Sequence, residues 1–410
     1  MRRLLWSLSI AISILSLTLT AAAQESTGQV MVPESSIAKP GDLGVRARTN
    51  VSILVPFAKH GAPPFPGYFF ETPASIACVY ELVSSLEFGC NPNKTTLNPS
   101  GGSRTIAVVD AYDDPTASLD LGRFSKQFGL PKAKFSVVYA NGGIRPPVDP
   151  TGGWELEESL DIEWTHAMAP KAKIILVEAR SNTLGDLLQA EDVASKLVAS
   201  SGGGEISNGW GGDEFPGESF FDSHFTKKGV VYVAASGDAP GVEYPASSPN
   251  VVGAGGTSIM RDPTSGAFQG ETAWQLTGGG PSVFEERPTY QDVISGIVGD
   301  VRGTPDMSLD GDPNSGAWVY DSNPIMGEVG WFIVGGTSLS SAALAGIINS
   351  AGNFYSSTNA ELTVVYDNLG NDDDYRDITT GTCGLYIAYE AVMGWDFCTG
   401  VGSAIGLNGK

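Results

Sequence analysis

Short apolar segments alternate with longer helical segments over about 150 residues, and this alternation constrains the fold more than any other feature of the chain. The segments that read as strands are 104–110, 171–178, 205–207, 229–236 and 250–254, and those that read as helices are 115–128, 154–168 and 184–199. Strands separated by helices in this way form a mostly parallel sheet that helices cover on both faces. The sequence therefore predicts an α/β fold.

The predicted strands end in loops that carry polar residues. Asp110, Asp213, Asp238 and Ser338 all lie in such loops. In an open parallel sheet, ligands bind at the carboxyl ends of the strands. We therefore expect the chemistry of this chain at that edge.

The stretch 331–350 places one serine in a setting that suits a nucleophile. Apolar Phe332–Val334 breaks at Gly335-Gly336 and continues as a run of small and apolar residues that reads as a buried helix. Ser338 falls at this junction, where helix amides and the positive end of the helix dipole would stabilise an oxyanion. The alternative is that the serine only caps the helix. The same tetrapeptide ends at Ser258 without a following helix, so the setting carries the prediction, and the tetrapeptide alone is weak.

A second informative stretch is the acidic helix predicted over 154–168. Glu157 and Asp161 are four residues apart and so share one face of that helix. Two neighbouring carboxyl groups split their pKa values, which lets one accept a proton while the other holds it in place. The alternative is a solvated acidic face. Glu158 and Glu163 lie on other faces of the helix, and we expect their side chains to be exposed to solvent.

The three histidines give no obvious base for a serine nucleophile. His166 is off the face that Glu157 and Asp161 share, His224 reads as part of a helix that packs on the sheet, and His60 lies in the N-terminal part. A hydrolase in which His166 acts as the base for a serine nucleophile stays open as a further possibility.

Several ordered motifs between about Thr72 and the C-terminus carry a family resemblance. They are ELEESLDIEWTHAMAPKAKI, SNGWGGDEF, ASGD at 235–238, EYPASSPNVVGAGGTS, GTPDMSLDGDPNSG, GGTSLSSAALAGI and a closing DIT…GWDFCTGVGS. In this order the chain resembles the sedolisins, serine-carboxyl peptidases with a subtilisin-like fold. The resemblance implies Ser338 as nucleophile, Glu157 as general base and Asp161 as the group that orients Glu157. A carboxylate base suits acidic solution, where a histidine would be protonated.

One position departs from the family pattern. The family uses an aspartate in its oxyanion hole, and the residue that aligns with it here is Phe215. We expect Asp213 or Glu214, just before it, to reach the oxyanion, with a slight preference for Asp213. If neither does, the backbone N–H of Ser338 remains the main donor, and losing one donor costs about 3–4 kcal/mol of transition-state stabilisation.

The resemblance also implies a calcium site near the C-terminus. Its carboxylates would come from Asp377 and Asp396, and its backbone carbonyls from Ile378, Val392 and Gly394. Hard oxygen ligands of this kind suit Ca²⁺. The alternative is that 372–377 is an acidic surface loop.

The N-terminus has the pattern of a secretory signal peptide. A basic pair is followed by an apolar run and small residues, with cleavage predicted after Ala23. We interpret 24–70, rich in proline and glycine, as an arm or linker and 71–410 as one sedolisin-like peptidase domain. The interval before Thr72 is too short for the large prodomain that the family usually carries.

Charge and cysteine content limit the partners. The formal net charge of −22 argues against nucleic acid or an anionic membrane as a partner.

Four cysteines in an exported chain should pair, and their spacing favours Cys78 with Cys90 and Cys383 with Cys398 among three possible connectivities. We expect a secreted monomer that acts on polypeptides. The alternative is a secreted protein of the same fold that serves only as a binding scaffold.

Overall fold

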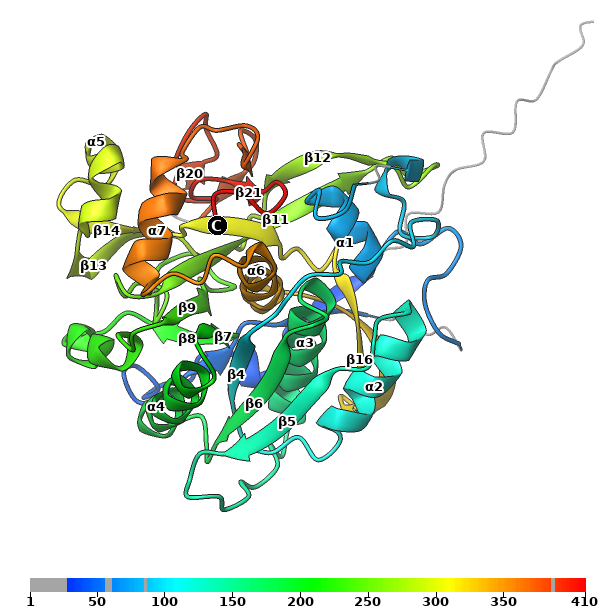
Figure 1. Ribbon diagram of the computed structural model, residues 1–410, viewed down its shortest axis with the longest axis horizontal. Helices are drawn as coiled ribbons and strands as arrows, with labels where there is room; N and C mark the ends of the chain where they lie inside the picture. Colours follow the sequence, from blue (N-terminus) through cyan, green and yellow to red (C-terminus); the bar gives the residue numbers. More distant parts are fainter. Residues whose placement is uncertain (1–27, 56–60, 85–86, 385–387) are drawn as a thin grey trace, which may run out of the picture.

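The central element of the computed structural model is a twisted eight-stranded sheet (Figure 1). The structure describes residues 28–55, 61–84, 87–384 and 388–410. Seven of its strands lie side by side in the order β12 (Phe268–Ala273), β11 (Val252–Arg261), β9 (Val230–Ala235), β7 (Gly204–Asn208), β4 (Thr105–Ala111), β6 (Lys173–Ala179) and β5 (Lys134–Tyr139). The eighth strand, β15 (Met307–Asp310), also pairs with β11. Only the pairing of β11 with β12 is antiparallel.

Each face of this sheet has its own apolar core. Every residue of β4 is buried, and alternate side chains enter opposite cores: Ile106 and Val108 lie in one, Ala107 and Val109 in the other. Such continuously apolar strands are typical of parallel sheets covered on both sides. The predicted α/β fold with helices on both faces is confirmed.

Seven α-helices flank the sheets. They are α1 (Pro73–Val79), α2 (Ala117–Phe128), α3 (Gly153–Met168), α4 (Leu184–Ser200), α5 (Ser295–Val298), α6 (Thr337–Ala351) and α7 (Thr358–Asp367) within the described ranges. Helices α3 and α6 pack side by side on one face, and α4 covers the other (Figure 1). The contact between α3 and α6 is close because α6 is built from small residues. A Cβ on Gly346 would lie 2.6 Å from Met168 Cβ and 2.9 Å from the Thr165 carbonyl oxygen.

The interpretation of 24–70 as a separate arm or linker is wrong for residues 28–55. Strands β1 (Gln29–Met31) and β3 (Ser52–Val55) join a second sheet in the order β1-β3-β17-β16, where β17 is Glu328–Gly335 and β16 is Ala317–Ile325. Strand β2 (Arg48–Thr49) joins a third sheet in the order β10-β8-β2, where β8 is Trp210–Asp213 and β10 is Glu243–Tyr244. Backbone pairing therefore integrates this segment into the domain, which composition alone did not reveal.

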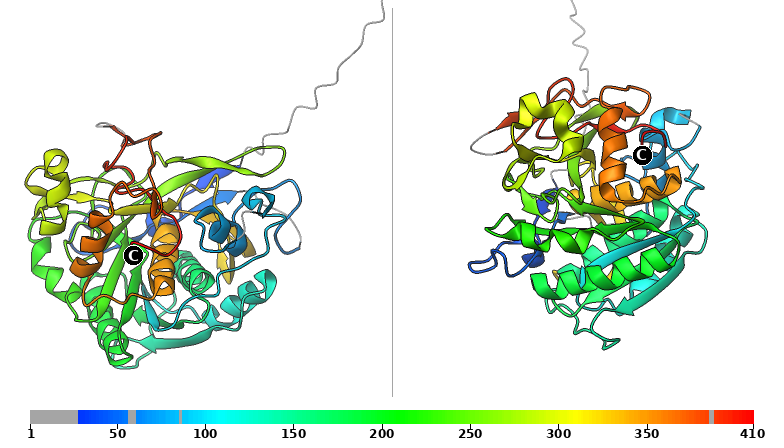
Figure 2. Two further views of the ribbon diagram at one scale, coloured as in Figure 1. Left: turned by 45° about the horizontal axis from the view of Figure 1, so that its top comes forward. Right: turned by 60° about the vertical axis from the view of Figure 1, so that its left-hand side comes forward.

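The C-terminal chain forms loops beside β12 and α7, coloured red in Figures 1 and 2. Three two-stranded pairs lie in this region and near it: β13 (Gly280–Glu286) with β14 (Val301–Thr304), β18 (Tyr375–Arg376) with β21 (Ser403–Ala404), and β19 (Thr382–Cys383) with β20 (Tyr389–Glu390). Both predicted disulfides, Cys78–Cys90 and Cys383–Cys398, are present. The predicted signal peptide lies outside the described residues, and none of the helices in the described ranges is long and apolar enough to cross a membrane.

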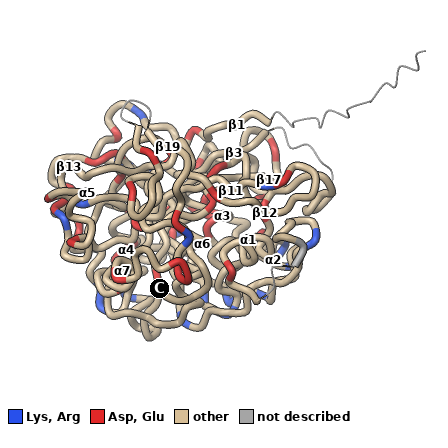
Figure 3. Tube along the Cα trace, turned by 90° about the horizontal axis from the view of Figure 1, so that it is seen from above, with Lys and Arg blue, Asp and Glu red and all other residues tan. Residues whose placement is uncertain are grey.

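Many acidic residues lie inside the protein. Figure 3 shows Asp and Glu spread over the whole tube, and Asp110, Glu178 and Glu205 are among those that are fully buried. Every residue of α3 is buried, so the expectation of a solvated role for Glu158 and Glu163 is wrong. The helix lies between the sheet, α2 and α6, which leaves it no solvent-facing side. The formal charge therefore overstates the charge that solvent meets, because burial disfavours ionisation.

Candidate active site

Ser338 lies in the first turn of α6, directly after the break from β17. Gly336 makes the break with a φ of 118°. A Cβ there would overlap the Asn50 carbonyl oxygen and lie 2.5 Å from Asp238 Oδ2, so the position requires glycine. Ser338 is fully buried; its backbone N–H donates to the Asn50 carbonyl oxygen at 3.2 Å, and its hydroxyl donates to the Gly209 carbonyl oxygen at 2.6 Å.

The structure brings Ser338 together with Glu157 and Asp161 of α3. All three side chains surround Gly209, which follows β7. A Cβ on Gly209 would overlap Glu157 Oε1, and it would lie 2.8 Å from Asp161 Oδ2 and 3.0 Å from Ser338 Oγ. The absent side chain at Gly209 therefore leaves the space in which a serine hydroxyl and two carboxyl groups meet.

Capping and helix packing position the two carboxyl groups. Helix α3 begins where Asp149 Oδ2 accepts hydrogen bonds from the amides of Gly153 at 3.1 Å and Trp154 at 3.2 Å. Because Glu157 and Asp161 are one helical turn apart, both point from α3 toward the same spot. The close α3–α6 contact then fixes their approach to Ser338.

Burial dominates the electrostatics of this cluster. It raises the pKa of Glu157 well above its usual value; the charges of Asp161 and Asp110 raise it further, and interaction with the Ser338 hydroxyl lowers it. Burial also raises the pKa of Asp161, against the opposing effect of the Gly209 amide. Since the groups are close and desolvated, they share protons rather than ionising independently. The site is built for proton transfer between carboxyl groups and a hydroxyl.

A further carboxyl group, Asp238, lies at the turn before Ser338. Its Oδ1 accepts hydrogen bonds from the Thr337 amide at 2.7 Å and the Thr337 hydroxyl at 3.0 Å. Its Oδ2 is buried without a hydrogen bond in the described part of the chain. Burial raises the pKa of Asp238 to about 7, so the group is protonated in acidic solution. A protonated Oδ2 is a hydrogen-bond donor aimed at the space beside Asn50 and Gly336.

The expectation that Asp213 or Glu214 serves the oxyanion is wrong in this structure. Asp213 is largely exposed and pairs with Arg48 at 2.6 Å. Glu214 accepts from the Val283 amide at 3.0 Å and from the Ser282 hydroxyl. Pairing of β8 with β2 and β10 directs these residues away from Ser338. The signal that identifies Asp238 instead is the Ala-Ser-Gly-Asp that follows the buried strand β9 at the predicted edge.

The remaining sequence candidates lie away from this cluster. His166 is buried with Nε2 2.9 Å from the Pro131 carbonyl oxygen, and burial lowers the pKa of its ring. His224 pairs with Asp192 at 3.0 Å, and His60 lies outside the described residues. Ser258 lies in β11 and donates to Asp312 at 2.7 Å. Neither described histidine contacts Ser338, so the geometry does not support a Ser-His pair.

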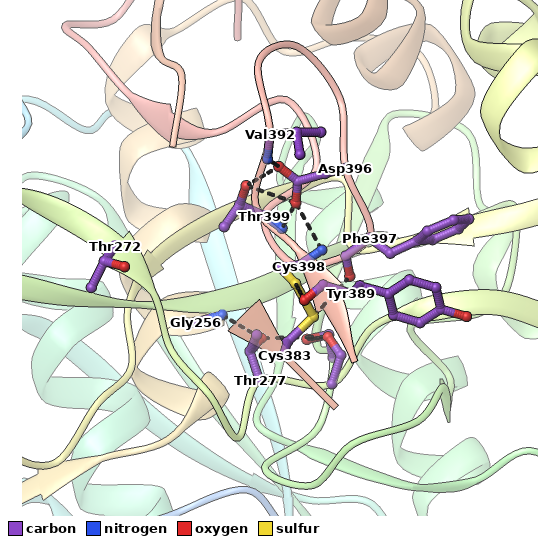
Figure 4. Close-up of a disulfide and its surroundings, with 12 residues drawn as sticks. Gly256, Thr272, Thr277, Cys383, Tyr389, Val392, Asp396, Phe397, Cys398 and Thr399 are labelled. Atoms are coloured by element: carbon purple, nitrogen blue, oxygen red, sulfur yellow. Dashed lines mark hydrogen bonds between the residues drawn. A yellow bond between two sulfur atoms is a disulfide. The ribbon is translucent and has the colours of Figure 1, made fainter. Parts of the chain in front are cut away.

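The residues expected to bind calcium meet at one C-terminal loop. Asp377 Oδ2 accepts from the Gly394 amide at 2.8 Å, and the Asp396 carboxylate accepts from the Val392 amide at 3.0 Å. Figure 4 shows that the Asp396 carboxylate also accepts hydrogen bonds from the backbone amides of Cys398 and Thr399. Within the described ranges no group of three or more His, Cys, Asp or Glu residues is placed to hold a metal.

The donor set at this loop nevertheless fits a hard cation. Two carboxyl groups, Asp377 and Asp396, hold the same loop, and backbone carbonyls would complete the coordination. Asp377 Oδ1 is buried and accepts no hydrogen bond in the described structure, which leaves one oxygen free for a cation. The disulfide Cys383–Cys398 fixes the far side of the loop.

No family model matches the chain. Among curated proteins, it is 26% identical over 351 residues to sedolisin of Pseudomonas sp. (strain 101), covering 74% of this chain and 57% of that protein. It is 28% identical over 381 residues to kumamolisin of Bacillus sp. (strain MN-32), covering 82% of this chain and 62% of that protein. The chain thus spans less than two thirds of the length of these relatives.

A solved structure agrees with the fold. Pseudomonas sedolisin, a serine-carboxyl proteinase complexed with two molecules of pseudo-iodotyrostatin, superposes with a TM-score of 0.65 at 23% sequence identity. The match covers 82% of this chain and 95% of that one.

Proposed function

The chain belongs to the sedolisin family, and on that premise we propose that it is a serine-carboxyl peptidase with Ser338 as its nucleophile. The convergence of Ser338, Glu157 and Asp161 around Gly209 carries the proposal. A hydroxyl beside a desolvated carboxyl pair at a helix N-terminus has the parts that acyl transfer needs: a nucleophile, a proton acceptor and amide donors.

In the proposed reaction Glu157 accepts the proton of Ser338 as Oγ attacks the carbonyl carbon of a peptide bond. Asp161 holds Glu157 in place, and its charge increases the proton affinity of Glu157. Glu157 then gives the proton to the leaving amine, which leaves an ester on Ser338. A water molecule hydrolyses the ester by the reverse sequence of proton transfers.

The oxyanion in this reaction lies between two donors. One is the Ser338 amide at the start of α6, and the other is the protonated Oδ2 of Asp238. Asp238 is a donor only below its pKa of about 7, so the reaction runs in acidic solution.

Hydrolysis of casein at about pH 3–5 tests the proposal. Wild-type protein should release acid-soluble peptides, and Ser338→Ala and Glu157→Gln should each abolish the release. Ser258→Ala is the matched control, because it changes the same tetrapeptide in β11 and should act like wild type. A wild-type protein that binds but never hydrolyses polypeptides would instead be a scaffold, and undiminished activity in Ser338→Ala would remove this triad.

Calcium would stabilise the C-terminal loop of this peptidase. Asp377 and Asp396 would supply carboxylate oxygens, and Ile378, Val392 and Gly394 backbone oxygens. The ion would tie together two segments that the disulfide Cys383–Cys398 also restrains. This role is structural, and no step of the reaction depends on it.

The cellular setting in this proposal follows from the sequence. A signal-like N-terminus and two disulfides suit export to an oxidising compartment, and the acidic composition suits a protein that works apart from nucleic acid and membrane. Polypeptides are the substrates, and the working unit is a monomer. Fractionation of producing cells and light scattering of the purified protein test these two points.

A further inference from the structure

A carboxyl group lies in the middle of the mostly apolar face that α4 turns toward the sheet. The buried residues of this helix recur at the spacing of one helical face; they are Leu184, Leu187, Leu188, Ala190, Glu191, Ala194, Ser195 and Val198. Glu191 is fully buried, and within the described residues neither of its carboxyl oxygens makes a hydrogen bond. Burial of such a group costs free energy that a leucine at this position would not cost. Packing alone therefore does not explain Glu191.

The side chain that faces Glu191 from the sheet is Asn208, the last residue of β7. Side chains alternate along a strand, and Ile206 lies in the core on the α4 side, so Asn208 faces α4 as well. Its Nδ2 donates to the Val233 carbonyl oxygen of β9 at 3.3 Å, whereas its Oδ1 is buried without a partner in the described chain. The Asn208 side chain also shifts the pKa of Glu191, which places the two groups within interaction distance.

A proton on Glu191 provides hydrogen bonds for both groups. Burial raises the pKa of Glu191 to about 8, while the Asn208 side chain lowers it and the charge of Asp192 raises it further. Burial also raises the pKa of Tyr232 of β9, which interacts with Glu191, so both side chains are neutral in acidic solution. A neutral carboxyl group opposite a primary amide can donate to the amide oxygen and accept from the amide nitrogen. This pairing supplies the donor that Asn208 Oδ1 otherwise lacks.

The residue after Asn208 holds the proposed catalytic groups on the opposite face of the sheet. The Gly209 carbonyl oxygen accepts the Ser338 hydroxyl at 2.6 Å, and the Gly209 amide opposes the rise in pKa that burial causes at Asp161. A Cβ on Gly209 would lie within 3.0 Å of an oxygen of each of the three catalytic side chains. A backbone so close to three such groups tolerates little displacement. The anchor of the Asn208 side chain therefore also sets the distances among these groups.

We propose that Glu191 is a positioning residue for the peptidase reaction: through Asn208 it fixes the Asn208–Gly209 peptide and thereby the approach of Ser338 to its carboxyl pair. This inference rests on the proposed peptidase function. It assigns a role to a buried acid on the face of the sheet away from the site. Glu191 touches no reacting atom, and its effect passes through the Asn208 side chain and the Gly209 backbone to the Ser338 hydroxyl.

Two substitutions at Glu191 separate positioning from packing. Glu191→Gln keeps a neutral group that can donate to Asn208 Oδ1 and accept from Nδ2, so kcat for peptide hydrolysis at about pH 4.5 should stay near the wild-type value. Glu191→Leu completes the apolar face of α4 but removes both hydrogen bonds. Its melting temperature should therefore equal or exceed that of the wild type while kcat falls roughly 10- to 100-fold. A residue that only packs would give a leucine variant at least as active as the glutamine variant.

Substitution of Asn208 tests the route by which Glu191 acts. Asn208→Leu should lower kcat as Glu191→Leu does, and the double variant should lose no more than the more affected single variant, because both changes break the same connection. If Glu191→Leu does not fold, Glu191→Met takes its place in each comparison.

Glu361→Leu is the matched control. Glu361 is also buried, and neither of its carboxyl oxygens has a hydrogen-bond partner in the described part of the chain. It lies on α7, which packs mainly against β9 and residues 289–294. Its replacement should leave kcat unchanged.

The outcomes distinguish this inference from the proposed function. Loss of kcat in Glu191→Leu with retention in Glu191→Gln and no further loss in the double variant supports both. A wild-type protein that hydrolyses no peptide overturns the peptidase function and this inference with it. An active wild type with an equally active Glu191→Leu overturns the positioning role and leaves the peptidase. The positioning role also fails if Glu191→Gln loses as much kcat as Glu191→Leu, if the losses in the double variant multiply, or if Glu361→Leu loses as much.

Discussion

Replacement of Asp238 tests the proposed oxyanion donor directly. Asp238→Asn keeps an acceptor at Oδ1 for the Thr337 amide and hydroxyl and places an NH₂ group where Oδ2 lies. That group donates at every pH, whereas the native carboxyl donates only when protonated. Asp238→Ala removes the donor and leaves the buried Thr337 amide without its partner.

The magnitudes follow from the pKa of about 7. Near pH 5 the wild-type carboxyl is almost fully protonated, and at pH 8 only about a tenth of it is, so wild-type activity should fall roughly tenfold per pH unit above 7. Loss of one oxyanion donor costs about 3–4 kcal/mol, so Asp238→Ala should lower kcat by roughly 100- to 1000-fold near pH 5. Asp238→Asn should stay close to wild type near pH 5 and keep its activity at pH 8.

The assay is kcat and kcat/KM for one peptide from pH 3 to 9, with melting temperatures to show that each variant folds. Asp213→Ala and Glu214→Ala are the controls, since neither residue contacts Ser338. The reasoning fails if Asp238→Ala retains wild-type kcat near pH 5, or if Asp238→Asn loses activity above pH 7 as the wild type does.

Three further predictions concern stability. Burial raises the pKa of Glu205 to about 8, above its usual 4.5. The contribution of Glu205 to the free energy of unfolding is therefore complete below about pH 4.5 and falls by about 1.4 kcal/mol per pH unit as pH rises toward 8. Thermal unfolding at several pH values should show a smaller decline in stability for Glu205→Gln. The control Glu34→Gln, at an exposed position, should show the wild-type decline. A chelator should lower the melting temperature of wild-type protein but not of Asp396→Ala, and equal melting curves with and without chelator in wild type would count against the calcium site. Gly346→Ala, whose methyl group meets Met168 Cβ at 2.6 Å, should destabilise by about 1–3 kcal/mol in urea titrations, whereas Gly122→Ala in α2, with open space around it, should stabilise by about 0.5–1 kcal/mol.

Local pattern was enough to predict the scaffold of the site. The short, mostly apolar run of β4 and the long uninterrupted helical segment of α3 are local features of the sequence, so the bounds of both elements agree with the prediction to within a few residues. Ser338 was distinguishable from Ser258 because only the former is followed by a helix. The i, i+4 spacing of Glu157 and Asp161 then fixed their common direction.

What the sequence could not supply were contacts between distant segments. Proline and glycine made residues 28–55 read as a linker, but strand pairing with β8 and β17 is a nonlocal interaction that composition does not encode. The sequence predicts Asp238 at the carboxyl edge of the sheet, but its hydrogen bond with Thr337 joins residues 99 positions apart in the chain. Burial of Glu158 and Glu163 was missed because a helix covered on all sides shows no polar face from which to infer exposure.

The interior carboxyl groups make folding a proton-uptake reaction. Glu191, Glu205 and Glu361 each have a pKa raised to about 8 by burial, so at neutral pH they hold protons that the unfolded chain would release. The enthalpy of unfolding should therefore vary with the ionisation enthalpy of the buffer. In a weakly buffered solution each molecule that unfolds acidifies the medium, and the lower pH favours the folded state of the molecules that remain.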